Sequence, residues 1–121
     1  MHNRKLKLAV DEIIEIYDFL NKLSSDYSFF VVEGSITKLK MDNKEFEFLT
    51  NCKEYLQTFL ETNSESNKMI NLIKDYYIVF YNFYEKIEKR VFSKKFIVTN
   101  LTNTILELRP IYEKIIEVYN E

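Results

Sequence analysis

The sequence predicts an all-α protein, an antiparallel (up-down-up-down) four-helix bundle, and three observations favour this class. Apolar residues recur at helical spacing through most of the 121 residues. The chain has one Gly and one Pro, whereas turn-rich β-sandwiches and barrels need such residues at many positions. A chain of this length can also bury a sizeable core without disulfides or metal ions. We therefore expect a single helical-bundle domain over residues 1–121.

The first helix is expected over residues 4–24. Its apolar residues form one stripe over five turns, and charged residues form the opposite stripe. Leu8 and Phe19 fall outside the apolar stripe, on the mostly charged side. The following segment, 25–41, breaks this pattern because two short β-favouring runs flank Gly34. Two interpretations stay open for this connection, an irregular packed loop and a short β-hairpin that lies on the bundle.

The second helix is expected over residues 43–62, with Asp42 as its N-cap. Its apolar stripe includes Phe59 and the adjacent Leu60. A short polar connector separates this helix from the next one, and short connections between long helices predict antiparallel neighbours.

The third helix, expected over residues 67–91, is the central element of the predicted bundle. Its apolar side chains, which include Tyr76 and Phe80, cover more than half of the helix circumference and leave a narrow polar stripe. A helix that is apolar over so much of its surface is typically packed against neighbours on several sides.

The fourth helix is expected over residues 94–119, with Ser93 as a reasonable N-cap. Its apolar stripe keeps the same phase on both sides of Pro110, which points away from the stripe. Proline removes one helical hydrogen bond and crowds the preceding turn. We therefore expect one kinked helix, and two helices separated at Arg109 are the alternative.

Side chains that could support catalysis are few. The only histidine is His2, so the Glu-x-x-His pairs of di-iron bundles and the Cys/His clusters of zinc sites are excluded. The only thiol, Cys52, lies on an apolar stripe and is expected to be a small buried hydrophobe. No Gly-rich phosphate loop occurs. We therefore expect a protein that is not an enzyme, with no catalytic, cofactor-binding or metal-binding residues and no cofactor.

The single cysteine favours a reducing compartment, and no apolar run has the length of a signal peptide or a membrane span. We expect a cytoplasmic protein, without a membrane partner, from a bacterium or phage. The net charge of −2 gives no overall signal for nucleic acid, although the charge is unevenly distributed.

One basic-aromatic segment, residues 86–96, is named here the basic joint. It contains these candidate anion-binding or nucleic-acid-binding residues: Lys86, Lys89, Arg90, Phe92, Lys94, Lys95 and Phe96. Cations that alternate with aromatic rings can hold phosphates while a ring stacks on a base. The alternative interpretation is that cations at the end of the third helix stabilise its dipole.

Apolar residues beyond the needs of a four-helix core suggest a protein interface. The candidates lie on the third helix and on the off-stripe side of the first: Tyr77, Ile78, Tyr81, Tyr84, Leu8 and Phe19. Tyrosine is enriched at protein interfaces because its ring can be dry while its hydroxyl stays hydrated. The alternative is that the rings belong to the core and their hydroxyls simply reach the bundle surface. We therefore expect a small module that binds another protein or forms a homodimer, such as an accessory, inhibitor, immunity or adaptor subunit. A nucleic-acid-binding subunit that uses the basic joint is the alternative.

Overall fold

The protein is built from α-helices, as the sequence predicts. The computed structural model describes residues 4–25, 30–33, 36–39, 43–63, 65, 67–88 and 94–121, with side chains at 4–25, 43–63, 65, 67–88 and 99–121. Four helices lie in this part of the chain: α1 (Arg4–Ser25), α2 (Asn43–Thr62), α3 (Lys68–Glu88) and α4 (Lys94–Tyr119).

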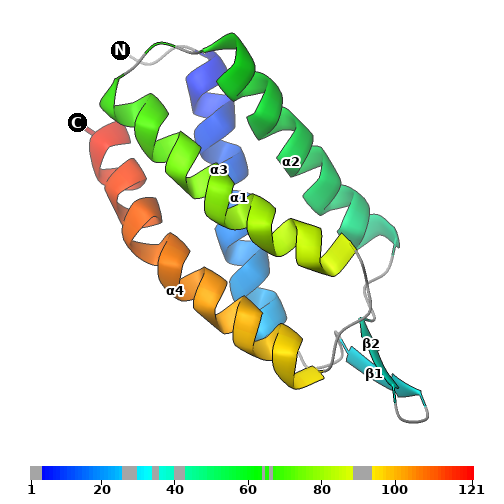
Figure 1. Cartoon of the computed structure of the whole chain (residues 1–121). Helices are drawn as coiled ribbons and strands as arrows, with labels where there is room; N and C mark the ends of the chain where they lie inside the picture. The colour runs from blue at the N-terminus through cyan, green and yellow to red at the C-terminus, as the bar shows by residue number, and fades with distance from the viewer. Residues whose placement is uncertain are drawn as a thin grey trace.

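Successive helices run in alternating directions, and the start of α1 and the end of α4 lie at the same end of the molecule (Figure 1). Helix α1 packs against α2 and α4, and α3 packs against the same two helices. Helices α1 and α3 therefore occupy diagonal corners of the bundle. The packing between α3 and α4 is the most extensive, and that between α2 and α3 is less extensive.

Two short strands, β1 (Phe30–Glu33) and β2 (Ile36–Leu39), lie between α1 and α2. They pair antiparallel, with Phe30 opposite Leu39 and Glu33 opposite Ile36. Strand β2 contacts α4, so the pair lies at the end of the bundle where α4 begins (Figure 1). An isolated two-stranded hairpin is marginally stable in water, and contact with a helix supplies additional support.

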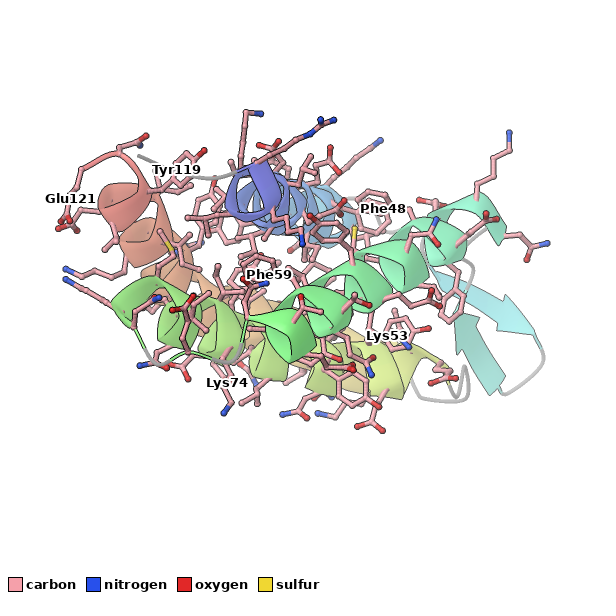
Figure 2. The ribbon with its side chains drawn as sticks, turned by 90° about the horizontal axis from the view of Figure 1, so that it is seen from above. Phe48, Lys53, Phe59, Lys74, Tyr119 and Glu121 are labelled. Carbon is pink, nitrogen blue, oxygen red and sulfur yellow. The ribbon has the colours of Figure 1, made fainter. Side chains whose placement is uncertain are left out.

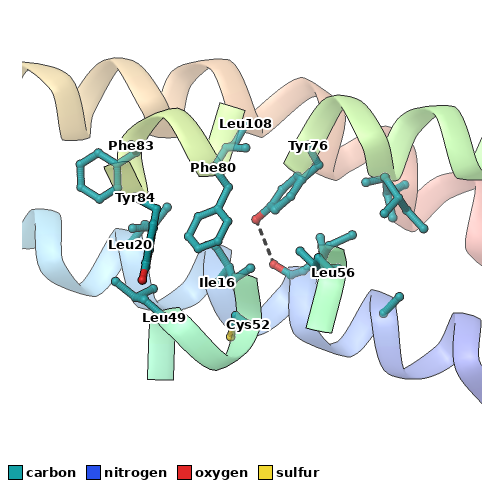
Figure 3. Close-up of a cluster of buried hydrophobic side chains, with 14 of the residues drawn as sticks. Ile16, Leu20, Leu49, Cys52, Leu56, Tyr76, Phe80, Phe83, Tyr84 and Leu108 are labelled. Carbon is teal, nitrogen blue, oxygen red and sulfur yellow. Dashed lines mark hydrogen bonds between the residues drawn. The ribbon is translucent and has the colours of Figure 1, made fainter. Parts of the chain in front are cut away.

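The core is formed by the apolar stripes of all four helices, which meet along the bundle axis. Figure 3 shows part of it, where aromatic side chains of α3 meet aliphatic side chains of the other helices. Its fully buried large side chains are Ile13, Ile16, Leu20, Leu49, Leu56, Ile73, Tyr76, Phe80, Phe83, Ile87, Leu108 and Ile115. The 3.6-residue periodicity thus identified the buried face of each helix correctly.

The start of α3 has a local cause in the sequence. Asn67 accepts a hydrogen bond from the amide of Ile70 through its side-chain oxygen, at 2.8 Å. This bond satisfies one amide at the N-terminus of the helix, which is the usual role of an N-cap asparagine. The caps expected at Asp42 and Ser93 lie outside the described residues.

Helix α4 is continuous through Pro110, so the alternative of two helices separated at Arg109 is wrong. Pro110 is exposed, and Leu106, whose carbonyl loses its helical donor, is 53% exposed. The carbonyl can therefore be hydrated, which lowers the cost of the missing bond and allows the helix to continue.

Candidate functional site

Three of the expected interface residues lie together on α3, along its side next to α2. Ile78 is 48% exposed, and Tyr77 and Tyr81 are half-buried. The two tyrosine rings stack with their centroids 5.7 Å apart. The 100° rotation per residue places positions 77, 78 and 81 within one arc of the helix, so this grouping follows from the sequence.

Tyr84 does not belong to this surface, and its place among the expected interface residues is wrong. Its side chain is 4% exposed and lies between α2 and α3. The hydroxyl shares a hydrogen bond of 2.9 Å with the hydroxyl of Thr50, and the ring stacks on Phe46 at 5.5 Å. Lys53 covers the ring, with its ammonium nitrogen 5.2 Å from the ring centroid.

Leu8 and Phe19 are separated from the α3 residues because they belong to the diagonal helix, α1. Leu8 is 40% exposed, and the Phe19 ring packs against Phe48 of α2 with centroids 5.1 Å apart. The six expected residues therefore do not form one continuous surface.

An open groove with a volume of about 680 Å³ runs along the seam between α2 and α3. We call it the α2–α3 groove. Its lining residues come from the end of α2, the connector and the first two-thirds of α3: Gln57, Leu60, Glu61, Asn63, Glu65, Ile70, Asn71, Lys74, Tyr77, Ile78 and Tyr81. The less extensive packing of α2 against α3 leaves room for this groove.

Leu60 shows why sequence reasoning missed the groove. Phe59 is buried and points into the bundle, as Figure 2 shows, whereas the adjacent Leu60 is only half-buried and lines the groove. Adjacent residues on a helix are 100° apart, so Leu60 lies at the edge of the arc that Phe59 directs into the core. This spacing was the available signal, because it places one apolar residue at the boundary between core and surface.

The charged side chains of the groove have no partners among the described residues. Glu61 and Glu65 stand on the α2 and connector side, Lys74 stands on α3, and none forms an ion pair in the described part of the chain. Lys74 points outward from its helix (Figure 2). Burial, together with the nearby Tyr81 hydroxyl and Glu61 carboxylate, raises the pKa of the Tyr77 phenol. The groove thus combines an apolar, aromatic floor with a charged rim, where acidic side chains outnumber basic ones.

Cys52 is buried, as expected for a small hydrophobe. Burial raises the pKa of its thiol, and a hydrogen bond to the Glu12 carboxylate raises it further. The thiolate is the reactive form of cysteine, so this environment opposes nucleophilic chemistry at neutral pH.

The basic joint lies largely outside the described side chains. Lys86 is half-buried and lines a small polar groove of about 160 Å³ between α3 and α4, with Asn82, Asn103 and Glu107. Residues Lys89, Arg90 and Phe92, and the side chains of Lys94, Lys95 and Phe96, are not described.

Two further properties concern the described residues only. No group of three or more His, Cys, Asp or Glu side chains is placed to hold a metal ion there. No helix in the same part of the chain has the length and apolar character needed to cross a membrane.

Comparison with known proteins gives no relative: no family model, no curated protein and no solved structure matches the chain. Any functional conclusion therefore depends on the geometry and chemistry of the molecule itself.

Proposed function

We propose that this protein is a non-enzymatic helical interaction module that binds another protein, or a second copy of itself, through the α2–α3 groove. The observation that carries the proposal is the placement of Ile78, Tyr77 and Tyr81 along one edge of this groove. A single exposed apolar residue is ordinary, but here a nearly half-exposed isoleucine adjoins two stacked tyrosines, so the apolar area is grouped at one place.

The chemistry of these side chains suits a protein partner. Tyrosine contributes a large contact area with few rotatable bonds, and it often dominates the binding energy of interfaces. The groove also has the anatomy of an interface, because Leu60 and Ile70 add to an apolar centre while charged groups occupy the rim.

A role without catalysis agrees with the side chains available. Catalytic nucleophiles and bases need accessible, activated groups, whereas the sole thiol is buried and its protonated form is stabilised. We therefore propose an accessory, inhibitor, immunity or adaptor subunit rather than an enzyme.

The test is affinity capture from a native lysate with the wild-type chain, with Tyr77→Ala/Tyr81→Ala and with Ile78→Ser, each with and without nuclease. Leu8→Ala is the matched control, because it removes an exposed apolar side chain from the diagonal helix. Sedimentation velocity of the same variants measures self-association.

We expect a protein partner, or a dimer, that survives nuclease and the Leu8→Ala change but is lost from the groove variants. A partner or dimer retained by every groove variant would refute the assignment to this surface. Loss of all captured material on nuclease treatment would instead favour nucleic acid bound by the basic joint.

A further inference from the structure

We infer that the occupant of the α2–α3 groove is an amphipathic helix of the partner, with an apolar stripe bordered by Lys or Arg along the edge that faces α2. This inference rests on the proposed function, since it specifies what the same surface recognises. It specifies that the occupant is a helix and which charges it carries. Either statement can be wrong even if the groove binds a protein.

The spacing of the groove residues matches the length of a short helix. On α3 the lining positions extend from Ile70 to Tyr81, so they span about 16 Å at 1.5 Å per residue. A partner helix of three to four turns covers this length. It would lie between α2 and α3 as a fifth helix, with apolar residues at i, i+3 or i+4, and i+7 directed at the floor.

The walls of the groove disfavour an extended peptide. Added strands bind through unpaired backbone amides and carbonyls at a sheet edge. Most of the lining residues belong to helices α2 and α3, where backbone groups bond to one another outside the terminal turns. The groove therefore offers no continuous row of free amides and carbonyls, and recognition comes mainly from side chains, as in grooves that bind amphipathic helices.

The charges at the rim of the groove determine which charged side chains the bound helix should carry. Glu61 and Glu65 lie on one side of the floor and are unpaired among the described residues, whereas Lys74 lies on α3. Cations on the α2-facing edge of a bound helix would complement the two carboxylates, and an acidic or amide side chain would complement Lys74. A strongly acidic ligand would meet repulsion from Glu61 and Glu65.

The experiment is a selection from a displayed library of random 16-residue peptides against the folded full chain. The same selection is run on Glu61→Lys/Glu65→Lys, on Ile78→Ser and on Leu8→Ala. Both glutamates are exposed, so the charge reversal should leave the thermal unfolding midpoint unchanged, which is measured in parallel.

The wild-type chain and Leu8→Ala should enrich the same peptides, with apolar residues at helical spacing and Lys or Arg on one edge. Their affinity should fall by about tenfold or more in Glu61→Lys/Glu65→Lys and in Ile78→Ser, because the contacts at the rim and the floor are lost. The charge-reversed chain should enrich peptides with acidic residues on that edge, and bound peptides should show helical circular dichroism.

Enrichment of peptides without helical spacing, or with an acidic edge on the wild-type chain, would overturn the inference. The inference would also be overturned if no selected peptide lost affinity in Ile78→Ser. If the capture experiment still yields a protein lost from Ile78→Ser, the proposed function survives and only the helical occupant is refuted. If the groove substitutions change neither the captured protein nor the selected peptides, the proposed function and the helical occupant are both refuted.

Discussion

The hydroxyl of Tyr76 donates a hydrogen bond to the carbonyl oxygen of Ile13, at a distance of 3.0 Å, and so joins the diagonal helices α3 and α1 (Figure 3). Both residues are fully buried. An unpaired hydroxyl in an apolar core would be destabilising, and this bond removes that penalty. Among the described residues, no buried side-chain nitrogen or oxygen lacks a hydrogen-bond partner.

Replacing Tyr76 by Phe should lower the free energy of unfolding at pH 7 by about 1 kcal/mol, because the hydrogen bond is lost while the ring stays in place. Urea denaturation followed by circular dichroism measures this change. Tyr81→Phe is a suitable control, because this half-buried tyrosine lies at the groove rather than in the core. Unchanged or increased stability of Tyr76→Phe would show that the free energy lost on burying the hydroxyl equals or exceeds the free energy gained from its hydrogen bond.

Stability should fall in alkali, and Tyr76 should contribute to the fall. Burial raises the pKa of its phenol above the ordinary value of 10.0. Below pH 10 the proton is bound in both states, so the contribution is fully present. Above pH 10 the unfolded chain releases this proton first, and stability decreases by about 1.4 kcal/mol per pH unit for this group. The stability curve of Tyr76→Phe between pH 9 and 11 should therefore be shallower than that of the wild type. Parallel curves would contradict this expectation.

Cys52 should react with thiol reagents only when the bundle opens. The thiol is buried and its pKa is raised, so the native state offers neither access nor thiolate. Labelling with an aromatic disulfide at pH 8 should be slow in buffer and should accelerate with urea in parallel with unfolding. A fast, complete reaction in buffer alone would show that α1 and α2 separate without global unfolding.

Tyr81 and Tyr84 should differ sharply when each is replaced by Ala. Tyr84→Ala removes a buried ring and its bond to Thr50, so we expect a loss of about 3–5 kcal/mol of stability. Tyr81→Ala removes a half-buried ring at the groove, so the loss should be about 1 kcal/mol, while binding is weakened strongly. Chemical denaturation and binding measured on both variants test this contrast. Equal losses of stability would place Tyr81 in the core.

Replacing Pro110 by Ala should raise stability by about 1–3 kcal/mol, because it restores the amide that can bond to the carbonyl of Leu106 and removes the ring from the preceding turn. Pro110→Gly restores the same amide but adds backbone freedom, so its gain should be smaller by about 1 kcal/mol. Thermal and urea unfolding of both variants provide the measurement. A loss of stability in Pro110→Ala would show that the shape imposed by proline improves the packing of α4.

Much of the fold was predictable because helical periodicity is a local property. The stripe of α1, with Ile13, Ile16 and Leu20, was evident from residue spacing, and the same residues are fully buried. The exposed position of Pro110 followed from the helical periodicity of the fourth helix. This exposure explains why α4 continues through the proline.

The candidate site was predictable only in part. Residue spacing grouped Tyr77, Ile78, Tyr81 and Tyr84 on the third helix, but a wheel describes the angle around one helix and not the distance to its neighbours. Tyr84 is covered by Thr50, Phe46 and Lys53 of α2, residues far away in the sequence.

By itself, the sequence determined which residues form helices and which side of each helix is apolar, because both depend on contacts within a few residues along the chain. Only the tertiary structure decided which apolar residues stay accessible. Helix α2 packs closely enough on α3 to bury Tyr84, yet further along the same seam it leaves Tyr77, Ile78 and Tyr81 beside an open groove. That difference depends on the relative placement of two helices, and no local periodicity encodes it.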